Sequence, residues 1–258
     1  MKQLNIGIVG AGRIGNVHAK SITYFIPQAR VVKVTDVVEE SAKRLAETYG
    51  IPAYSTNYMD IIDDPTIDAV LVCSPTPTHA DIAIAAMKAG KHVFSEVLPV
   101  QTMREAVELV ECVEQTGKIY AYGENYCYMP GPYEMRKLYR EGKIGEFEYG
   151  EGEYIHNCEP IWPSITYGDP GHWRNLMYAT YYCTHSLGPL VHITGLRPVS
   201  VVGFESGKVE RKLRCGDRSG LFGIEMVTLE NGAIVKSIHG GLYRNSIWYT
   251  LYGAKGRA

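Results

Sequence analysis

The fold is decided by the stretch Asn5-Ile6-Gly7-Ile8-Val9-Gly10-Ala11-Gly12-Arg13-Ile14-Gly15. Its pattern is that of a buried strand running into a glycine turn and then into a helix. Gly10 permits the tight turn, Gly12 lets a pyrophosphate approach the backbone, and Gly15 lets the helix pack close to the strand. The helix start, at Arg13 and Ile14, offers unpaired N–H groups and a positive dipole end to phosphates. The stretch therefore predicts a dinucleotide-binding site.

An acidic residue follows at the expected distance. Residues Arg30 to Val34 have the pattern of a second strand, which ends at Thr35-Asp36, and Asp36 lies about 20 residues beyond the glycine loop, where a carboxylate can hold a ribose diol. An acid here repels a 2′-phosphate, and no arginine directly follows it, so the predicted cofactor is NAD rather than NADP. The alternative is an ordinary strand–turn–helix with a chance acid.

Composition narrows the class of protein. Apolar residues make up 45% and charged residues 21% of the 258 residues, as in soluble globular proteins, and the net charge of −2 favours neither nucleic acid nor an anionic membrane as a partner. No run is long enough to span a membrane, and the first strand begins too early to leave room for a signal peptide. The scattered cysteines form no C-x-x-C pair, which indicates reduced thiols and a cytoplasmic protein; they are Cys73, Cys112, Cys127, Cys158, Cys183 and Cys215.

Strands and helices alternate over the first half of the chain. The pattern predicts strands at 68–73, 92–95 and 119–122 and helices at 39–49, 80–89 and 102–116. This order is typical of a doubly wound parallel sheet, so residues 1–122 are predicted to form an NAD-binding Rossmann domain of the α/β class. The rigid turn Ser74-Pro75-Thr76-Pro77-Thr78-His79 follows one of these strands at the carboxyl edge, where such sheets bind ligands.

The second half has a different pattern. Residues 123–258 are predicted to form an α+β domain, with a largely antiparallel sheet, that serves the substrate and oligomerisation. The expected helices are 130–141 and 181–195, the latter interrupted at Gly188-Pro189, and 158–171 is expected to be a loop. The expected strands are 145–157, 199–205, 221–229, 233–237 and 246–252, with a hairpin at Glu230-Asn231-Gly232. The last strand leaves a sheet edge with nothing evident to close it, so we expect the natural protein to continue.

The order of several motifs resembles the Gfo/Idh/MocA family of sugar-acting, nicotinamide-dependent oxidoreductases. The matching segments are the Gly10–Gly15 loop with Asp36, Ser74-Pro75-Thr76 through His79, Ala89-Gly90-Lys91-His92-Val93-Phe94-Ser95-Glu96, Gly142-Lys143-Ile144-Gly145-Glu146 and Tyr252-Gly253-Ala254-Lys255-Gly256. The resemblance implies a two-domain fold and a homo-oligomer formed through the C-terminal sheet. It also implies that Glu96 contacts the nicotinamide ribose and Asn125 the nicotinamide amide; a solvated loop acid and a plain turn asparagine are the alternatives.

Two departures from the family pattern affect the chemistry. Dehydrogenases of the family have Glu-Lys-Pro where this chain has Glu96-Val97-Leu98-Pro99, and valine cannot move a proton. The family's Asp-x-x-x-His-x-x-Asp motif keeps its histidine at His185, but Tyr181 and Gly188 stand in place of its acids. The usual acid–base apparatus of a sugar dehydrogenase is therefore expected to be missing.

A subgroup, the NAD-dependent glycosidases of the α-N-acetylgalactosaminidase type, resembles the chain better. The matches are Glu124-Asn125-Tyr126-Cys127-Tyr128, Tyr154-Ile155-His156, His172-Trp173-Arg174 and Tyr182-Cys183-Thr184-His185-Ser186-Leu187-Gly188-Pro189. The resemblance implies that retained NAD oxidises a sugar at C3, that the C2 proton is removed and the aglycone eliminated, and that water addition and hydride return complete the cycle.

Four residues are the predicted catalytic groups. Tyr154 and His156 are two apart on a strand and so share a face, where they could move protons if the site lowers the pKa of the tyrosine. Tyr182 and His185 are three apart and are expected on one helical face. The alternatives are an ordinary aromatic strand face and a core histidine packed against a tyrosine.

Two further residues, Trp173 and Arg174, are candidates for ligand contacts. Trp173 could cover an apolar sugar face and Arg174 could hold a phosphate or a substrate oxygen, and both are grouped with the predicted cofactor-binding residues. The nearby histidines lack metal-ligand spacing, so no metal site is predicted; they are His156, His172, His185 and His192.

Three functions remain open at this point. The first is glycoside cleavage by transient oxidation, and the second is net oxidation of a sugar by NAD. The third is a nicotinamide-dinucleotide-binding protein without catalysis, which the missing lysine also suits.

Overall fold

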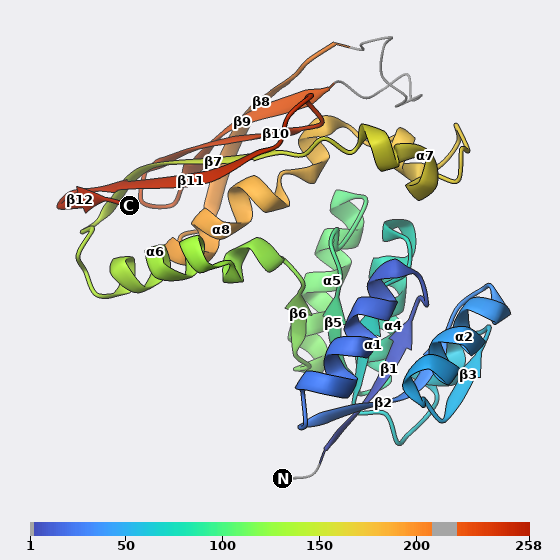
Figure 1. The fold of residues 1–258 in the computed structure, drawn as a ribbon. Coiled ribbons are helices and arrows are strands. Elements are labelled where there is room, and N and C mark those ends of the chain that lie inside the picture. Colours follow the sequence, from blue (N-terminus) through green and yellow to red (C-terminus); the bar gives the residue numbers. More distant parts are fainter. Residues whose placement is uncertain (1–2, 208–220) are drawn as a thin grey trace. The chain divides into compact units, whose positions relative to one another are not determined.

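The structure is a computed structural model that describes residues 3–207 and 221–258, so Cys215 lies outside the described residues. The chain divides into two compact units, Met1–Gly123 and Glu124–Ala258. Each unit is built around one six-stranded sheet (Figure 1).

The sheet of the first unit is parallel throughout. Its order is β3-β2-β1-β4-β5-β6. The chain therefore adds strands on one side of β1 up to β3 and then crosses over to add β4, β5 and β6 on the other side. The predicted doubly wound Rossmann sheet is thereby confirmed. The strands are β1 (Leu4–Val9), β2 (Ala29–Thr35), β3 (Ala53–Ser55), β4 (Ala69–Val72), β5 (His92–Ser95) and β6 (Tyr120–Tyr122).

Helices cover both faces of this sheet, which explains why its strands are apolar without alternation. Ile8 points into a core formed with α1 and α2, and its neighbour Val9 points into the opposite core with α4 and α5. The helices are α1 (Arg13–Phe25), α2 (Glu39–Tyr49), the short α3 (Met59–Ile62), α4 (His79–Lys88) and α5 (Met103–Thr116). Thr102 begins α5 with a capping box, in which its hydroxyl accepts from the Glu105 N–H.

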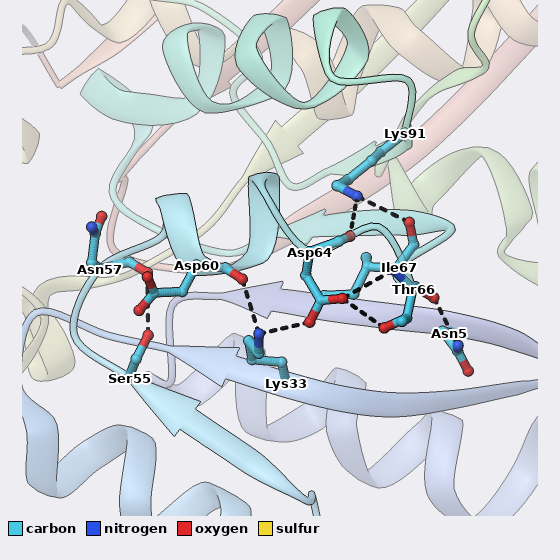
Figure 2. Close-up of polar contacts among 9 residues, drawn as sticks. All are labelled: Asn5, Lys33, Ser55, Asn57, Asp60, Asp64, Thr66, Ile67 and Lys91. Atoms are coloured by element: carbon cyan, nitrogen blue, oxygen red, sulfur yellow. Dashed lines mark hydrogen bonds and ion pairs between the residues drawn. The ribbon is translucent and has the colours of Figure 1, made fainter.

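Two lysines fix the loop between α3 and β4, as Figure 2 shows. Lys91 is only 4% exposed and donates to the carbonyls of Asp64 (2.6 Å) and Ile67 (3.1 Å). Lys33 on β2 donates to the Asp64 carboxylate (2.7 Å) and to the Asp60 carbonyl (3.0 Å). The hydrogen bond from Lys33 holds the pKa of Asp64 well below its usual range.

The second unit has a mostly antiparallel sheet of order β12-β11-β7-β10-β9-β8, in which only the β7–β10 pair is parallel. This confirms the predicted α+β half, including the hairpin between β9 and β10. The strands are β7 (Phe147–Ile155), β8 (Pro198–Glu205), β9 (Phe222–Leu229), β10 (Ile234–Gly240), β11 (Ser246–Gly253) and β12 (Gly256–Arg257). The short β12, which the sequence did not predict, pairs with β11.

The helices of this unit include several short turns. The longer ones are α6 (Pro130–Arg140) and α8 (Thr184–Thr194), which share a core with the sheet. The predicted loop 158–171 contains the 3-10 turn η3 (Glu159–Ile161) and α7 (Trp162–Ile165). The remaining 3-10 turns are η2 (Asn125–Tyr128), η4 (Trp173–Asn175) and η5 (Ala179–Tyr182).

The predicted helix 181–195 was wrong in two respects. Tyr182 ends η5 and precedes α8, and Pro189 lies inside an unbroken helix. Proline has no N–H to donate to the carbonyl of His185, four residues earlier. The Tyr249 hydroxyl on β11 donates to that carbonyl instead, at 2.6 Å. A side chain from the sheet thus replaces the helical hydrogen bond that Pro189 removes.

The helix α8 lies directly against β7. A Cβ at Gly152 would come 1.9 Å from the carbonyl oxygen of Ser186, so only glycine allows this approach. The Ser186 hydroxyl also hydrogen-bonds with that of Ser237 on β10, at 2.8 Å. These contacts fix the position of His185, next to Ser186, relative to Tyr154, two residues beyond Gly152.

Strand β8 presents an apolar surface to solvent. Four of its side chains are 62–72% exposed: Val199, Val201, Val202 and Phe204.

In the described residues, no helix is both long enough and apolar enough to cross a membrane.

We expect Lys33→Met to lower the free energy of unfolding by about 1–2 kcal/mol at pH 7, since a hydrogen bond between charged groups is lost. The carboxyl of Asp64 has a lower pKa folded than unfolded, so it stabilises the fold above about pH 4 and this contribution is lost as the pH falls. The difference between the two proteins should therefore shrink between pH 4 and pH 2 in urea titrations. Lys20→Met, at an exposed position on α1, is the control. A difference that stays constant over this pH range would contradict the assignment.

Candidate active site

The glycine loop after β1 leaves room for a ligand. Gly10 has φ +103°, and a Cβ there would come 2.6 Å from the Cys73 carbonyl; a Cβ at Gly15 would come 2.0 Å from the Gly10 oxygen. A Cβ at Gly12, by contrast, would meet nothing within 4 Å. Gly12 is also the N-cap of α1 and provides no capping side chain. The first N–H groups of α1, from Arg13 and Ile14, are thus available to a phosphate.

The carboxylate of Asp36 lies beside this loop. One oxygen accepts from the Ala11 N–H at 2.7 Å, and the other accepts from the Val38 N–H at 2.9 Å. Each oxygen keeps a further lone pair, with which a carboxylate can accept from a ribose hydroxyl. The open space at Gly12, the free helix start and this acid together fit the adenosine and pyrophosphate portion of NAD.

The turn after β4 is held from within. The Ser74 hydroxyl hydrogen-bonds with that of Thr78 at 2.7 Å, Pro75 is exposed, and Thr76 is buried in the 3-10 turn η1 (Thr76–Thr78). His79 is 1% exposed, with Nδ1 at 2.7 Å from the Leu98 carbonyl and Nε2 at 2.6 Å from the Ser74 carbonyl. Since both ring nitrogens are already used, His79 supports the turn and has no polar atom free for a ligand.

Glu96 directly follows β5 and contacts a histidine that the sequence analysis did not identify. Glu96 Oε1 lies 2.6 Å from Nε2 of His18 on α1, and Oε2 accepts from the Val97 N–H at 3.3 Å. His18 lies one helical turn after Gly15, so its position on the loop's own helix was the available signal. The contact fixes the carboxylate predicted to bind the nicotinamide ribose.

In the second unit, aromatic rings surround His185. Its ring centroid lies 4.6 Å from that of Tyr154, 4.8 Å from Tyr126 and 5.2 Å from Tyr182. The predicted neighbours Tyr182 and His185 are thus close together, although only His185 is in the helix. Tyr126 was not among the predicted catalytic residues.

A buried carboxylate, also missed, contacts His185. Glu124 is 4% exposed, and its Oε1 lies 2.8 Å from His185 Nδ1. The other oxygen, Oε2, accepts from the Thr184 hydroxyl at 2.6 Å. Residues 181 and 188 are not acidic, as the sequence analysis noted, and a carboxylate from another position, Glu124, contacts this histidine. Residues 124 and 185 are too far apart in the sequence for any spacing rule to connect them. A local indication of a side chain beside His185 was the glycine at position 188, where a Cβ would lie 3.1 Å from Glu124 Cγ.

Tyr154 and His156 form the second pair. The Tyr154 hydroxyl lies 2.8 Å from His156 Nδ1, and it also hydrogen-bonds with the hydroxyl of Tyr126. The Cys158 sulfur lies 3.4 Å from the same nitrogen. Burial, followed by the neighbouring tyrosines, raises the pKa of Tyr154 well above its ordinary value. The site therefore does not lower this pKa, and Tyr154 keeps its proton at neutral pH.

The other predicted residues of this unit are Asn125, Trp173 and Arg174. The Arg174 guanidinium stacks over the Trp173 ring, 4.4 Å from its centroid, and Asn125 is exposed at the start of η2. His192 contacts the ring of Tyr128. Within residues 3–207 and 221–258, no three His, Cys, Asp or Glu side chains come together as a metal site.

Residues 4–124 match the model of an oxidoreductase family with an NAD-binding Rossmann fold, Gfo/Idh/MocA. The chain is 33% identical over 205 residues to glycosyl hydrolase family 109 protein 2 of Shewanella sp. (strain ANA-3), covering 74% of this chain and 44% of that protein. It is 32% identical over 150 residues to scyllo-inositol 2-dehydrogenase (NAD(+)) of Bacillus subtilis (strain 168), covering 58% and 44%. The chain thus spans less than half the length of these curated relatives.

The fold is also similar to that of a solved structure, myo-inositol 2-dehydrogenase from Lactobacillus plantarum. The TM-score is 0.84 at 24% identity, over 100% of this chain and 76% of that one. At this identity the likeness concerns the fold alone.

Asp36→Ala should weaken NAD binding about 10–100-fold, because it removes the acid predicted to hold the ribose and the acceptor of the Ala11 N–H. Calorimetric titration with NAD and NADP measures this. Glu47→Ala, an exposed carboxylate on α2, is the matched control and should bind NAD like the unmodified chain. Tighter binding of NADP than of NAD by the unmodified chain, or unchanged NAD affinity in Asp36→Ala, would refute the assignment.

Proposed function

We propose, from the premise that this chain belongs to the Gfo/Idh/MocA oxidoreductase family, that it acts on a sugar or glycoside and cleaves it by transient oxidation with retained NAD. The observation that carries this proposal is the group of proton-moving side chains around His185, combined with a valine at position 97. We assign NAD binding to the first unit, and substrate binding and self-association to the second.

The overall reaction converts a glycoside and water into a free sugar and an alcohol, with no net change in the cofactor. NAD, when held by the Gly12 loop and Asp36, would supply the hydride acceptor and donor for C3. A C3 ketone acidifies the neighbouring C2–H, so that removal of this proton expels the glycosidic oxygen. The protein must therefore provide a base for the C3 hydroxyl, a base for C2 and a donor for the leaving oxygen.

The residues of the second unit suit these tasks. We assign removal of the C3 hydroxyl proton to His185, since a carboxylate at Nδ1 leaves Nε2 able to accept a proton. We assign removal of the C2 proton to His156, since a neutral imidazole has one ring nitrogen that can accept a proton. Tyr154 retains its own proton, so we assign it the role of orienting His156: its oxygen accepts from the Nδ1–H, and the lone pair of the imidazole is then on Nε2. The proton that His156 takes from C2 is then available for the leaving oxygen. The ring of Tyr182 packs edge-to-face against the ring of His185.

A net NAD-dependent sugar dehydrogenase is the second candidate. The Glu124–His185 pair favours it, because a carboxylate-supported imidazole is also able to take the hydroxyl proton in simple oxidation. Relatives of both kinds are similar to the chain, but the match to the glycosyl hydrolase extends over 205 residues against 150 for the dehydrogenase. A binding protein without catalysis has less support, since side chains able to accept and hold protons gather around His185.

Self-association through the second sheet belongs to the same proposal. The exposed apolar side chains of β8 would lose contact with water in a homo-oligomer. The candidate partner is therefore a second copy of this chain.

The proposal predicts that the protein releases the aglycone of an aryl glycoside without any added oxidant and without accumulating NADH. His156→Ala and His185→Ala should each lower turnover about 10²–10⁴-fold, as expected for loss of a general base, while NAD stays bound. Aglycone and NADH absorbance measured together test this, and NAD content by mass spectrometry checks the bound cofactor.

His192→Ala is the control, because this histidine lies on the same helix but contacts Tyr128. Its turnover should stay within about threefold of the unmodified chain. Stoichiometric NADH formation with no aglycone would instead identify a net dehydrogenase.

A further inference from the structure

We propose that Glu124 is a positioning residue that fixes the tautomer of His185, and that residue 188 is glycine because the Glu124 side chain lies against the place that a side chain there would take. The inference rests on the proposed function only for its effect on turnover. Its structural part concerns which ring nitrogen of His185 carries the proton.

The Glu124 carboxylate is held at both oxygens. Oε1 lies 2.8 Å from His185 Nδ1 and also accepts from the Tyr126 N–H at 3.0 Å. Oε2 accepts from the Thr184 hydroxyl at 2.6 Å. Because an ionised carboxylate only accepts, the proton of a neutral His185 lies on Nδ1, and Nε2 keeps its lone pair. The carboxylate thus determines which nitrogen is able to act as a base.

The surroundings keep the imidazole in this orientation. Rings of Tyr126, Tyr154 and Tyr182 contact it, and the backbone carbonyl of His185 accepts from the Tyr249 hydroxyl. Rotation of the ring would therefore require several side chains to move. The side chains of His185 and Glu124 are both buried, so water competes little for this hydrogen bond.

The charge of Glu124 also acts on nearby thiols. Burial, with this carboxylate as a second cause, raises the pKa of Cys127 to about 12. Burial also raises the pKa of Cys183 to about 12, with the Glu225 and Glu124 charges adding to it. Both thiols therefore stay protonated, and neither competes with His185 as a base.

Gly188 lies three residues after His185 on α8, where a side chain would project toward His185 and Thr184. A Cβ at position 188 would lie 3.1 Å from Cγ and 3.7 Å from the carboxyl carbon of Glu124. An aspartate at 188 would thus put its carboxylate where that of Glu124 now lies. The site holds one carboxylate, and it can come from residue 124 or from residue 188, but not from both.

This exclusion is tested with four proteins: the unmodified chain, Glu124→Ala, Gly188→Asp and the double variant. Long-range ¹H–¹⁵N spectra of ¹⁵N-histidine-labelled protein report the His185 tautomer, and His185→Gln identifies its signals. The unmodified chain should show the proton on Nδ1, and Glu124→Ala should lose this preference, with turnover falling about 10²–10⁴-fold. Gly188→Asp alone should also lose turnover and melt at a lower temperature, because two carboxylates would crowd one space.

The double variant is the decisive protein. It should regain the Nδ1–H tautomer and at least about tenfold in turnover over Glu124→Ala, so that each substitution is harmful alone and helpful in the presence of the other. Glu124→Gln separates charge from geometry, since its amide oxygen can accept from Nδ1–H; it should keep the tautomer but lose turnover. An Nδ1–H tautomer that persists in Glu124→Ala, or a double variant worse than both single ones, would overturn the proposal.

The tautomer arm does not depend on catalysis. If the tautomers respond as expected while the unmodified chain turns over no glycoside, the proposed function fails and the positioning role stands. If glycoside is cleaved but the His185 tautomer is the same with and without Glu124, the positioning role fails and the proposed function stands.

Discussion

The second unit depends on a hydrogen bond between two side chains that are far apart in the sequence, Glu124 and His185. A buried carboxylate is costly unless it is paired, and removing one partner of such a pair typically costs about 3–5 kcal/mol. The surrounding structure meets this constraint with the Tyr126 N–H and the Thr184 hydroxyl, which satisfy the remaining carboxylate positions. Because Glu124 is the first residue of the unit, the pair also joins the start of this unit to α8.

The same constraint connects backbone geometry with chemistry. Gly152 lets α8 lie against β7, which brings His185 to Tyr154, and Pro189 frees the His185 carbonyl for Tyr249. Gly188 leaves space for the carboxylate. Three residues with unusual backbone properties therefore determine where one imidazole lies. In the first unit, glycines at the phosphate loop have a comparable role, since they create the space in which the backbone itself can bind an anion.

Most of the fold could be predicted because it is encoded locally. The apolar strands, the glycines that end α2 and α5 (Gly50 and Gly117) and the Thr102 capping box are short-range signals, and the predicted parallel and antiparallel sheets follow from their order. The error at 181–195 has a physical cause, since a proline does not break a helix when another donor bonds to the carbonyl it leaves unpaired. The cofactor loop and Asp36 were accessible for the same local reason, as one strand–turn–helix contains them.

The polar contacts between distant residues could not be predicted in this way. Glu124 is separated from His185 by 61 residues, and His18 from Glu96 by 78. The proton affinity of Tyr154 was also beyond the sequence, because it depends on burial and on the tyrosines that the fold places beside it. The sequence does show that residue 188 is glycine. The reason for this glycine becomes clear only when the fold places Glu124 beside it.

In the proposed reaction, the side chains around His185 and His156 move a proton at C2, and NAD is left unchanged at the end of each cycle. Turnover of an aryl glycoside in heavy water, with no added oxidant, tests it directly by mass spectrometry and NMR of the released sugar. We expect one deuterium at C2, because the abstracted proton exchanges with solvent before it returns. Release of the aglycone with only protium at C2 would contradict it.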